Sequence, residues 1–82
     1  MQGTYLIKLR DDSNEADFMR VTGFLQSNKA QIIMASRHGN WFIVVANQQS
    51  ADVIKKMHMV KCVGGVTFRK REVRIIRSKK HQ

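Results

Sequence analysis

The sequence predicts a small α+β domain in which a four-stranded antiparallel sheet carries two helices on one face. Its 82 residues suit a single domain. Hydrophobic periods of 2 and 3.6 follow one another in the order strand, helix, strand, strand, helix, strand. Polar residues and glycines separate these segments, and the chain contains no proline. In this length, that order closes most simply as a ferredoxin-like βαββαβ sandwich, with the first and third strands central and the other two at the edges.

The first predicted strand covers residues 4–10. Its alternation places Tyr5, Ile7 and Leu9 on one face and Lys8 on the other. One face of this strand is therefore expected to join the core.

The first predicted helix covers residues 13–27 and keeps one apolar stripe at helical spacing. Asp12 and Glu15 stand three residues apart, as in a capping box, and Asn28 is suited to end the helix. The stripe consists of Phe18, Val21, Thr22 and Leu25.

A hairpin is expected next, from strands at 30–36 and 41–46. The turn at 37–40 contains Gly39, which is free to take a positive φ. The continuous apolar run at 41–46 predicts a central strand that is covered on both faces for part of its length.

The second helix is expected after the polar loop 47–50, with Ser50 as its cap. Its end has two interpretations. The helix runs to about Cys62 and the glycines at 64–65 stop it, or it ends near Met59 and residues 60–63 begin a strand. Its apolar stripe consists of Ala51, Val53, Ile54, Met57 and Val60.

The last strand is predicted at residues 66–76. Residues 1–77 should form one compact basic domain, and residues 78–82 should be a flexible basic tail.

Charge is the strongest functional signal in this sequence. Fifteen Lys and Arg stand against six Asp and Glu, a formal net charge of +9. Seven of the cations crowd residues 69–80, whereas four of the acids lie between Asp11 and Asp17. Arginine predominates at 69–77, and its planar guanidinium suits phosphate. This asymmetry indicates a positive surface directed at a polyanion.

We therefore predict a small accessory or regulatory domain that binds nucleic acid, favouring RNA or single-stranded DNA, through a basic C-terminal strand. The alternative is a protein-interaction module: an inhibitor or chaperone like a protease propeptide, or a dimeric regulatory subunit. An acidic protein surface would then replace nucleic acid as the partner. The predicted nucleic-acid contacts are Lys8, Arg10, Phe42, Arg69, Lys70, Arg71, Arg74, Arg77, Lys79 and Lys80.

The central strands carry aromatic residues, and their placement resembles that of the RNA-recognition-motif family. In residues 38–45, the glycine, Phe42 and the aliphatic residue after it fit the third-strand motif of that family. Asn40 and Val45 stand where the motif has aromatics. The resemblance implies that Tyr5, Trp41 and Phe42 stack on bases from the open sheet face.

Residues 5–9, 41–46, 50–57 and 60–63 also resemble the propeptide-inhibitor family of subtilisin-like proteases. That family has a ferredoxin-like fold, and its C-terminal tail lies in the protease cleft. The long basic C-terminal end of this chain departs from the family pattern.

No catalytic, metal or cofactor site is predicted. The carboxylates near the first helix have a sufficient role in capping, and a general acid–base pair needs a pocket and a tuned pKa. His58 and Cys62 would share a helix face but lack a second half-site. Glycines 64–65 lack the spacing and the lysine of a phosphate loop.

The chain is expected to be cytoplasmic. Its single cysteine fits a reducing compartment, its N-terminus lacks the pattern of a signal peptide, and no apolar run is long enough for a membrane. A homodimer is a further hypothesis, because an open sheet face would expose Leu6, Phe42 or their neighbours.

Overall fold

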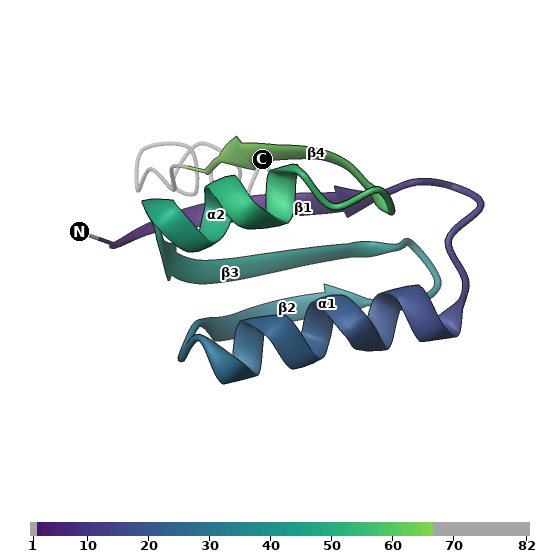
Figure 1. Cartoon of the computed structure of the whole chain (residues 1–82), viewed down its shortest axis with the longest axis horizontal. Helices are drawn as coiled ribbons and strands as arrows, with labels where there is room; N and C mark the ends of the chain where they lie inside the picture. Colours follow the sequence, from purple (N-terminus) through teal and green to yellow (C-terminus); the bar gives the residue numbers. More distant parts are fainter. Residues whose placement is uncertain (1, 67–82) are drawn as a thin grey trace, which may run out of the picture.

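A computed structural model of the chain describes residues 2–66 and shows the predicted α+β sandwich (Figure 1). Both helices lie on the same face of one four-stranded antiparallel sheet. The elements follow the predicted βαββαβ order, and the strands lie in the order β2-β3-β1-β4. The two central strands and the two edge strands are therefore the predicted ones. The elements are β1 (Gln2–Leu9), α1 (Glu15–Ser27), β2 (Gln31–Ser36), β3 (Trp41–Asn47), α2 (Gln48–Lys55) and β4 (Val60–Gly65).

The core lies between the sheet and the two helices. Alternate residues of β1 and β3 enter it because side chains in a strand project to opposite faces in turn. The largest side chains at its centre are Ile7, Leu9, Val21, Leu25, Phe42, Val44 and Ile54. These residues come from both central strands and both helices, so a single core holds the two layers together.

Among residues 2–66, strand β3 is covered on one face only, which does not fit the expectation of partial cover on both faces. Phe42, Val44 and Ala46 are buried, whereas the residues between them are only half-buried. Both helices follow right-handed crossovers to the same face, so nothing among residues 2–66 covers the other face.

Helix α1 begins two residues later than predicted, and its capping box uses a different pair. The side chain of Asn14 accepts a hydrogen bond from the Asp17 backbone at 2.9 Å, and the Asp17 carboxylate accepts one from the Asn14 backbone at 3.2 Å. The predicted pair of Asp12 and Glu15 is wrong. Asp12 belongs instead to the turn that leads from β1 into the helix. Asn28 ends the helix, as predicted.

Positive φ angles occur at Lys29 (60°) and Asn40 (58°), not at Gly39. Gly39 is required for a different reason. A Cβ at this position would lie 2.6 Å from Nε1 of Trp41, so the glycine makes room for the indole.

Helix α2 is shorter than either interpretation allowed, because it ends at Lys55. Its N-cap is Asn47, whose side chain accepts from the Ser50 backbone at 2.8 Å, so the assignment of the cap to Ser50 is wrong. Val53 also leaves the predicted stripe, since its side chain is exposed. The second interpretation, with a strand from residue 60, is the one that the structure confirms.

The fourth strand of the sheet is therefore β4, which begins six residues before the predicted start at residue 66 and ends before Val66. β4 pairs antiparallel with β1, from Leu9 opposite Val60 to Tyr5 opposite Gly65. Both glycines are part of the strand and do not stop a helix. The predicted residues 67–76 and the predicted tail 78–82 lie outside the described residues.

Candidate functional site

The candidate site is the sheet face that the helices leave free, called here the open face. The strand register places its side chains in rows across the sheet. Ile43 pairs with both Leu6 and Met34, and Leu6 pairs with Gly64. Residues directly opposite each other in a sheet point to the same side, so these residues form one apolar row. In spatial order the apolar row is Met34, Ile43, Leu6 and Gly64.

A second row lies beside it, called here the mixed row. The same pairings give its order as Ser36, Trp41, Lys8 and Cys62. Lys8 supplies the single charge of the two rows, and its Nζ donates a hydrogen bond to the Gly39 carbonyl at 2.7 Å. The Trp41 indole lies against the same glycine. The hairpin turn therefore contacts the two middle side chains of this row, Trp41 and Lys8.

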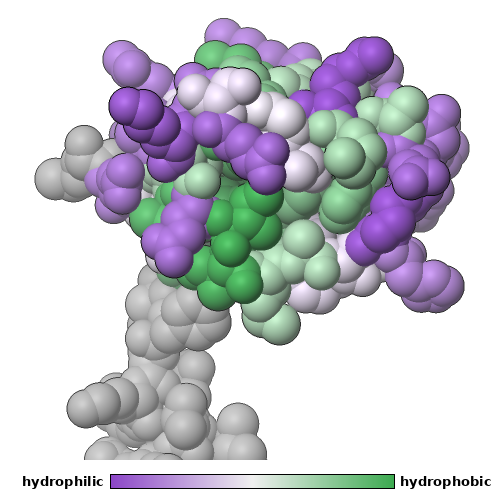
Figure 2. Space-filling model, turned by 90° about the horizontal axis from the view of Figure 1, so that it is seen from below, coloured by the Kyte–Doolittle hydropathy of each residue, from purple (hydrophilic) through white to green (hydrophobic). Residues whose placement is uncertain are grey.

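A shallow hollow of about 410 Å³ lies between the two rows, over β3, β1 and β4, and is lined by Leu6, Lys8, Trp41, Ile43 and Cys62. Gly64 of β4 lies opposite Leu6, which lines the hollow, and has open space where a Cβ would stand. At the other edge, Ile33 and Met34 of β2 are strongly exposed. Figure 2 views the molecule from the side of α1 and β2 and shows hydrophobic side chains gathered in one area between hydrophilic ones. The open face therefore has raised apolar side chains at the β2 edge and a hollow over its central strands that reaches β4.

Phe42 is absent from this face. Its side chain is 0% exposed, and its ring stacks on Phe18 with 4.5 Å between the centroids. The expectation that Phe42 contacts nucleic acid is therefore wrong. Tyr5 also packs against the core, which leaves Trp41 as the aromatic of the open face among residues 2–66. The base-stacking surface implied by the RNA-recognition-motif resemblance is not assembled.

The predicted cations are only partly placed. Lys8 lies on the open face, and Arg10 is an exposed residue directly after β1. The remaining predicted contacts lie outside the described residues: Arg69, Lys70, Arg71, Arg74, Arg77, Lys79 and Lys80.

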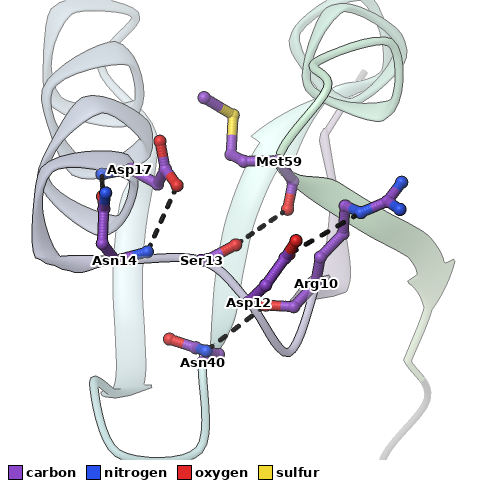
Figure 3. A network of polar contacts seen from close by, with 7 residues as sticks. All are labelled: Arg10, Asp12, Ser13, Asn14, Asp17, Asn40 and Met59. Carbon is purple, nitrogen blue, oxygen red and sulfur yellow. Dashed lines mark hydrogen bonds and ion pairs between the residues drawn. The ribbon is translucent and has the colours of Figure 1, made fainter.

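Two acidic residues near the start of α1, Asp12 and Asp17, have structural partners (Figure 3). Asp17 completes the helix cap, and Asp12 lies 3.9 Å from the Arg10 guanidinium in an exposed ion pair. In the same loop, the Ser13 hydroxyl donates to the Met59 carbonyl at 3.3 Å, which ties the loop to the start of β4. The Asn40 amide donates to the Arg10 carbonyl at 3.4 Å. These contacts join three loops at one end of the sheet, where Asp11 and Asp12 line one open hollow and Asp12 and Asp17 line a second.

His58 and Cys62 do not share a helix face, because α2 ends before them and Cys62 belongs to β4. In the part of the chain that the structure describes, no group of three or more His, Cys, Asp or Glu side chains is close enough to hold a metal ion. Within that same part, no helix combines the length and the apolar character that a membrane span requires.

Sequence reasoning missed Met34, Ile43 and Gly64 as candidate contact residues. Each is ordinary in its own segment, and only the pairing of three strands puts them in one row. The sequence of β2 offered no alternation to find them, because residues 32–35 are all apolar, and a bulge between Ile32 and Met34 also breaks the period of 2.

No protein-family description matches this sequence, and no curated protein is similar to it. Among solved structures, it is similar to part of phospho-2-dehydro-3-deoxyheptonate aldolase (DAHP synthase) from Thermotoga maritima, with a TM-score of 0.65 and 17% sequence identity. The match covers 82% of this chain but only 21% of that enzyme chain. At this identity the similarity concerns the fold alone.

Proposed function

We propose that the protein is a binding domain without catalytic activity, and that its basic C-terminal segment, residues 67–82, attaches it to nucleic acid. The observation that carries this proposal is the division of charge. Residues 2–66 contain eight Lys or Arg and five Asp or Glu. Residues 67–82 contain seven Lys or Arg and a single acidic residue, Glu72. Most of the net charge of +9 therefore belongs to the last sixteen residues.

The position at which this segment begins supports the proposal. The Val66 backbone donates to the Thr4 carbonyl at 2.8 Å, so the segment starts beside the N-terminal half of β1. Asp11 and Asp12 follow the other end of β1, about 20 Å away at the usual rise of a strand. That separation exceeds the ~8–10 Å over which charges interact in physiological salt. The loop carboxylates consequently do not neutralise the start of the basic segment.

Binding should rest on phosphate contacts and discriminate little between sequences. Phosphate contacts position a protein without reading bases, and the burial of Phe42 removes the ring proposed for stacking. RNA and single-stranded DNA are proposed as ligands on the basis of charge.

Fluorescence anisotropy against RNA, single-stranded DNA and duplex DNA at several salt concentrations tests this function. Replacing Arg69, Arg71 and Arg74 with alanine should flatten the slope of log affinity against log salt by about 2–3 units, since each lost contact contributes ~0.7–0.9. The matched control replaces three exposed cations on or beside the helices, Arg20, Lys55 and Lys56, and should leave the slope almost unchanged. An equal effect of both triple variants, or no binding by folded protein at low salt, would contradict the proposal.

A protein-interaction module, such as a dimeric regulatory subunit, is the second candidate function. The observation that favours it is the apolar row on the open face. Attachment through such a face should depend weakly on salt, because burial of apolar surface is not screened by ions.

A further inference from the structure

We propose that the open face binds a second copy of the same chain, in a weak two-fold dimer whose axis runs parallel to the strands. In this dimer Met34 of each copy lies over Gly64 of the other. The proposal deepens the second candidate function and does not depend on nucleic-acid binding.

The apolar row provides the shape argument. Its two ends differ: Met34 is 55% exposed at the β2 edge, whereas Gly64 has no side chain at the β4 edge. Leu6 and Ile43 lie between them. A row with a tall side chain at one end and none at the other fits against a second row that runs in the opposite direction. In that arrangement Met34 of the second copy fills the space above Gly64.

Only one orientation of the two-fold axis produces this reversal. An axis parallel to the strands turns the order β2-β3-β1-β4 around, so that β2 of one copy faces β4 of the other. An axis perpendicular to the strands, also in the plane of the interface, would place Met34 over Met34 and Gly64 over Gly64. Face-to-face sheets cross at about 30°, a rotation small enough to keep the central pairs of a row opposite each other.

The mixed row fits the same axis. Its reversal places Trp41 of one copy over Lys8 of the other, and the symmetry supplies this contact twice. An ammonium group over an indole ring is attracted by the ring electrons, most strongly where water is excluded. Lys8 therefore gains a second partner beside the Gly39 carbonyl when the face is covered.

The size of the face sets the expected strength. Four strands at ~4.8 Å spacing and about 20 Å of strand length give a footprint of about 400 Å² per copy. Stable interfaces bury about 800 Å² on each partner, so the face is too small for a permanent dimer. A reversible dimer with a micromolar or weaker dissociation constant is expected.

The test is analytical ultracentrifugation of the full chain over a range from micromolar to millimolar protein. Met34→Lys and Gly64→Glu should each raise the dimer dissociation constant at least tenfold. The Met34→Lys/Gly64→Glu double variant should restore dimerisation, because the two new charges face each other in the proposed arrangement. Met19→Lys is the matched control: Met19 is 56% exposed but lies on α1, so this variant should dimerise normally.

Circular dichroism checks the fold of each variant, and recovery in the double variant shows that the single changes act on the contact. A chain that stays monomeric at every concentration would overturn the second copy as the occupant of the open face. A dimer that both single variants leave intact would overturn this face as the interface. If the single variants weaken the dimer and the double variant does not restore it, the proposed orientation of the two-fold axis is wrong.

Discussion

The Phe42 ring stacks between the sheet and α1 against Phe18, while the neighbouring Trp41 indole lies on the open face against Gly39. These adjacent aromatics therefore have different roles. Phe42 contributes to stability because its whole side chain is removed from water. Trp41 is available to a partner.

We predict that Phe42→Ala lowers the free energy of unfolding by about 3–5 kcal/mol, because it leaves a cavity in the core and removes the aromatic stack. Urea denaturation measures this loss. The milder Phe42→Leu variant should stay folded and bind single-stranded nucleic acid as well as the unchanged chain. A selective loss of single-strand binding in Phe42→Leu would show that the ring contacts bases after all.

At the scale of the element, both ends of α1 depend on particular backbone partners. The capping box at its start satisfies backbone N–H groups that have no partner within the helix. At its end, Asn28 donates to the Phe24 carbonyl through its side chain, and Lys29 continues the turn with a left-handed backbone. The two ends of this helix thus allow separate stability experiments.

The capping assignment predicts that Asn14→Ala lowers the free energy of unfolding by about 1 kcal/mol, since it removes the acceptor for the Asp17 N–H. Asp12→Ala should cost much less, because the exposed Asp12–Arg10 pair contributes little. Thermal or urea denaturation of both variants shows whether the capping box is formed by Asn14 and Asp17 or by Asp12 and Glu15. A larger loss in Asp12→Ala would restore the capping box predicted from the sequence.

Glycine at position 29 should stabilise the protein. A non-glycine residue with a φ of 60° carries a steric cost of about 1 kcal/mol, which Lys29→Gly removes from an exposed site. Lys56→Gly is the control, since Lys56 ends α2 with a φ of −90° and gains nothing from glycine. We expect the first variant to be more stable and the second less stable than the unchanged chain, as measured by urea denaturation. Destabilisation by both would contradict the left-handed conformation of Lys29.

At the scale of the whole molecule, the proposed dimer and the basic segment act together. An axis parallel to the strands keeps all strand directions, so both copies begin their basic segments at the same end of the dimer. A single long nucleic acid would then reach two cationic segments at once, and the second contact would form at a high effective concentration.

We therefore predict that Gly64→Ile weakens binding to long single strands about tenfold or more and leaves binding to a ligand too short for two segments unchanged. The substitution fills the space that Met34 of the second copy needs, adds no charge, and has open room in the monomer. Gly23→Ala, also in open space but on α1, is the control and should change neither affinity. Anisotropy with the two ligand lengths is the measurement, and equal weakening on both ligands would contradict the prediction.

The order and type of the elements follow from the sequence by itself. The period of 2 in residues 4–10 identified a strand, and the period of 3.6 near Phe18 to Leu25 identified a helix. Each pattern depends only on neighbours along the chain. The choice of central strands followed from the apolar run at 41–46 and the right-handed crossover rule. The concentration of positive charge at residues 69–80 is likewise a property of the sequence alone.

Only the tertiary structure decided which side of a continuous apolar strand the helices cover. In residues 41–46 both faces are hydrophobic, so local alternation could not distinguish Phe42 in the core from Trp41 outside it. The start of β4 was also ambiguous locally. Val60 begins the strand because it pairs with Leu9, and the Arg10 N–H donates to the Met59 carbonyl at 2.8 Å. The apolar row depends most on tertiary structure, because hydrogen bonds between strands far apart in the sequence set its register.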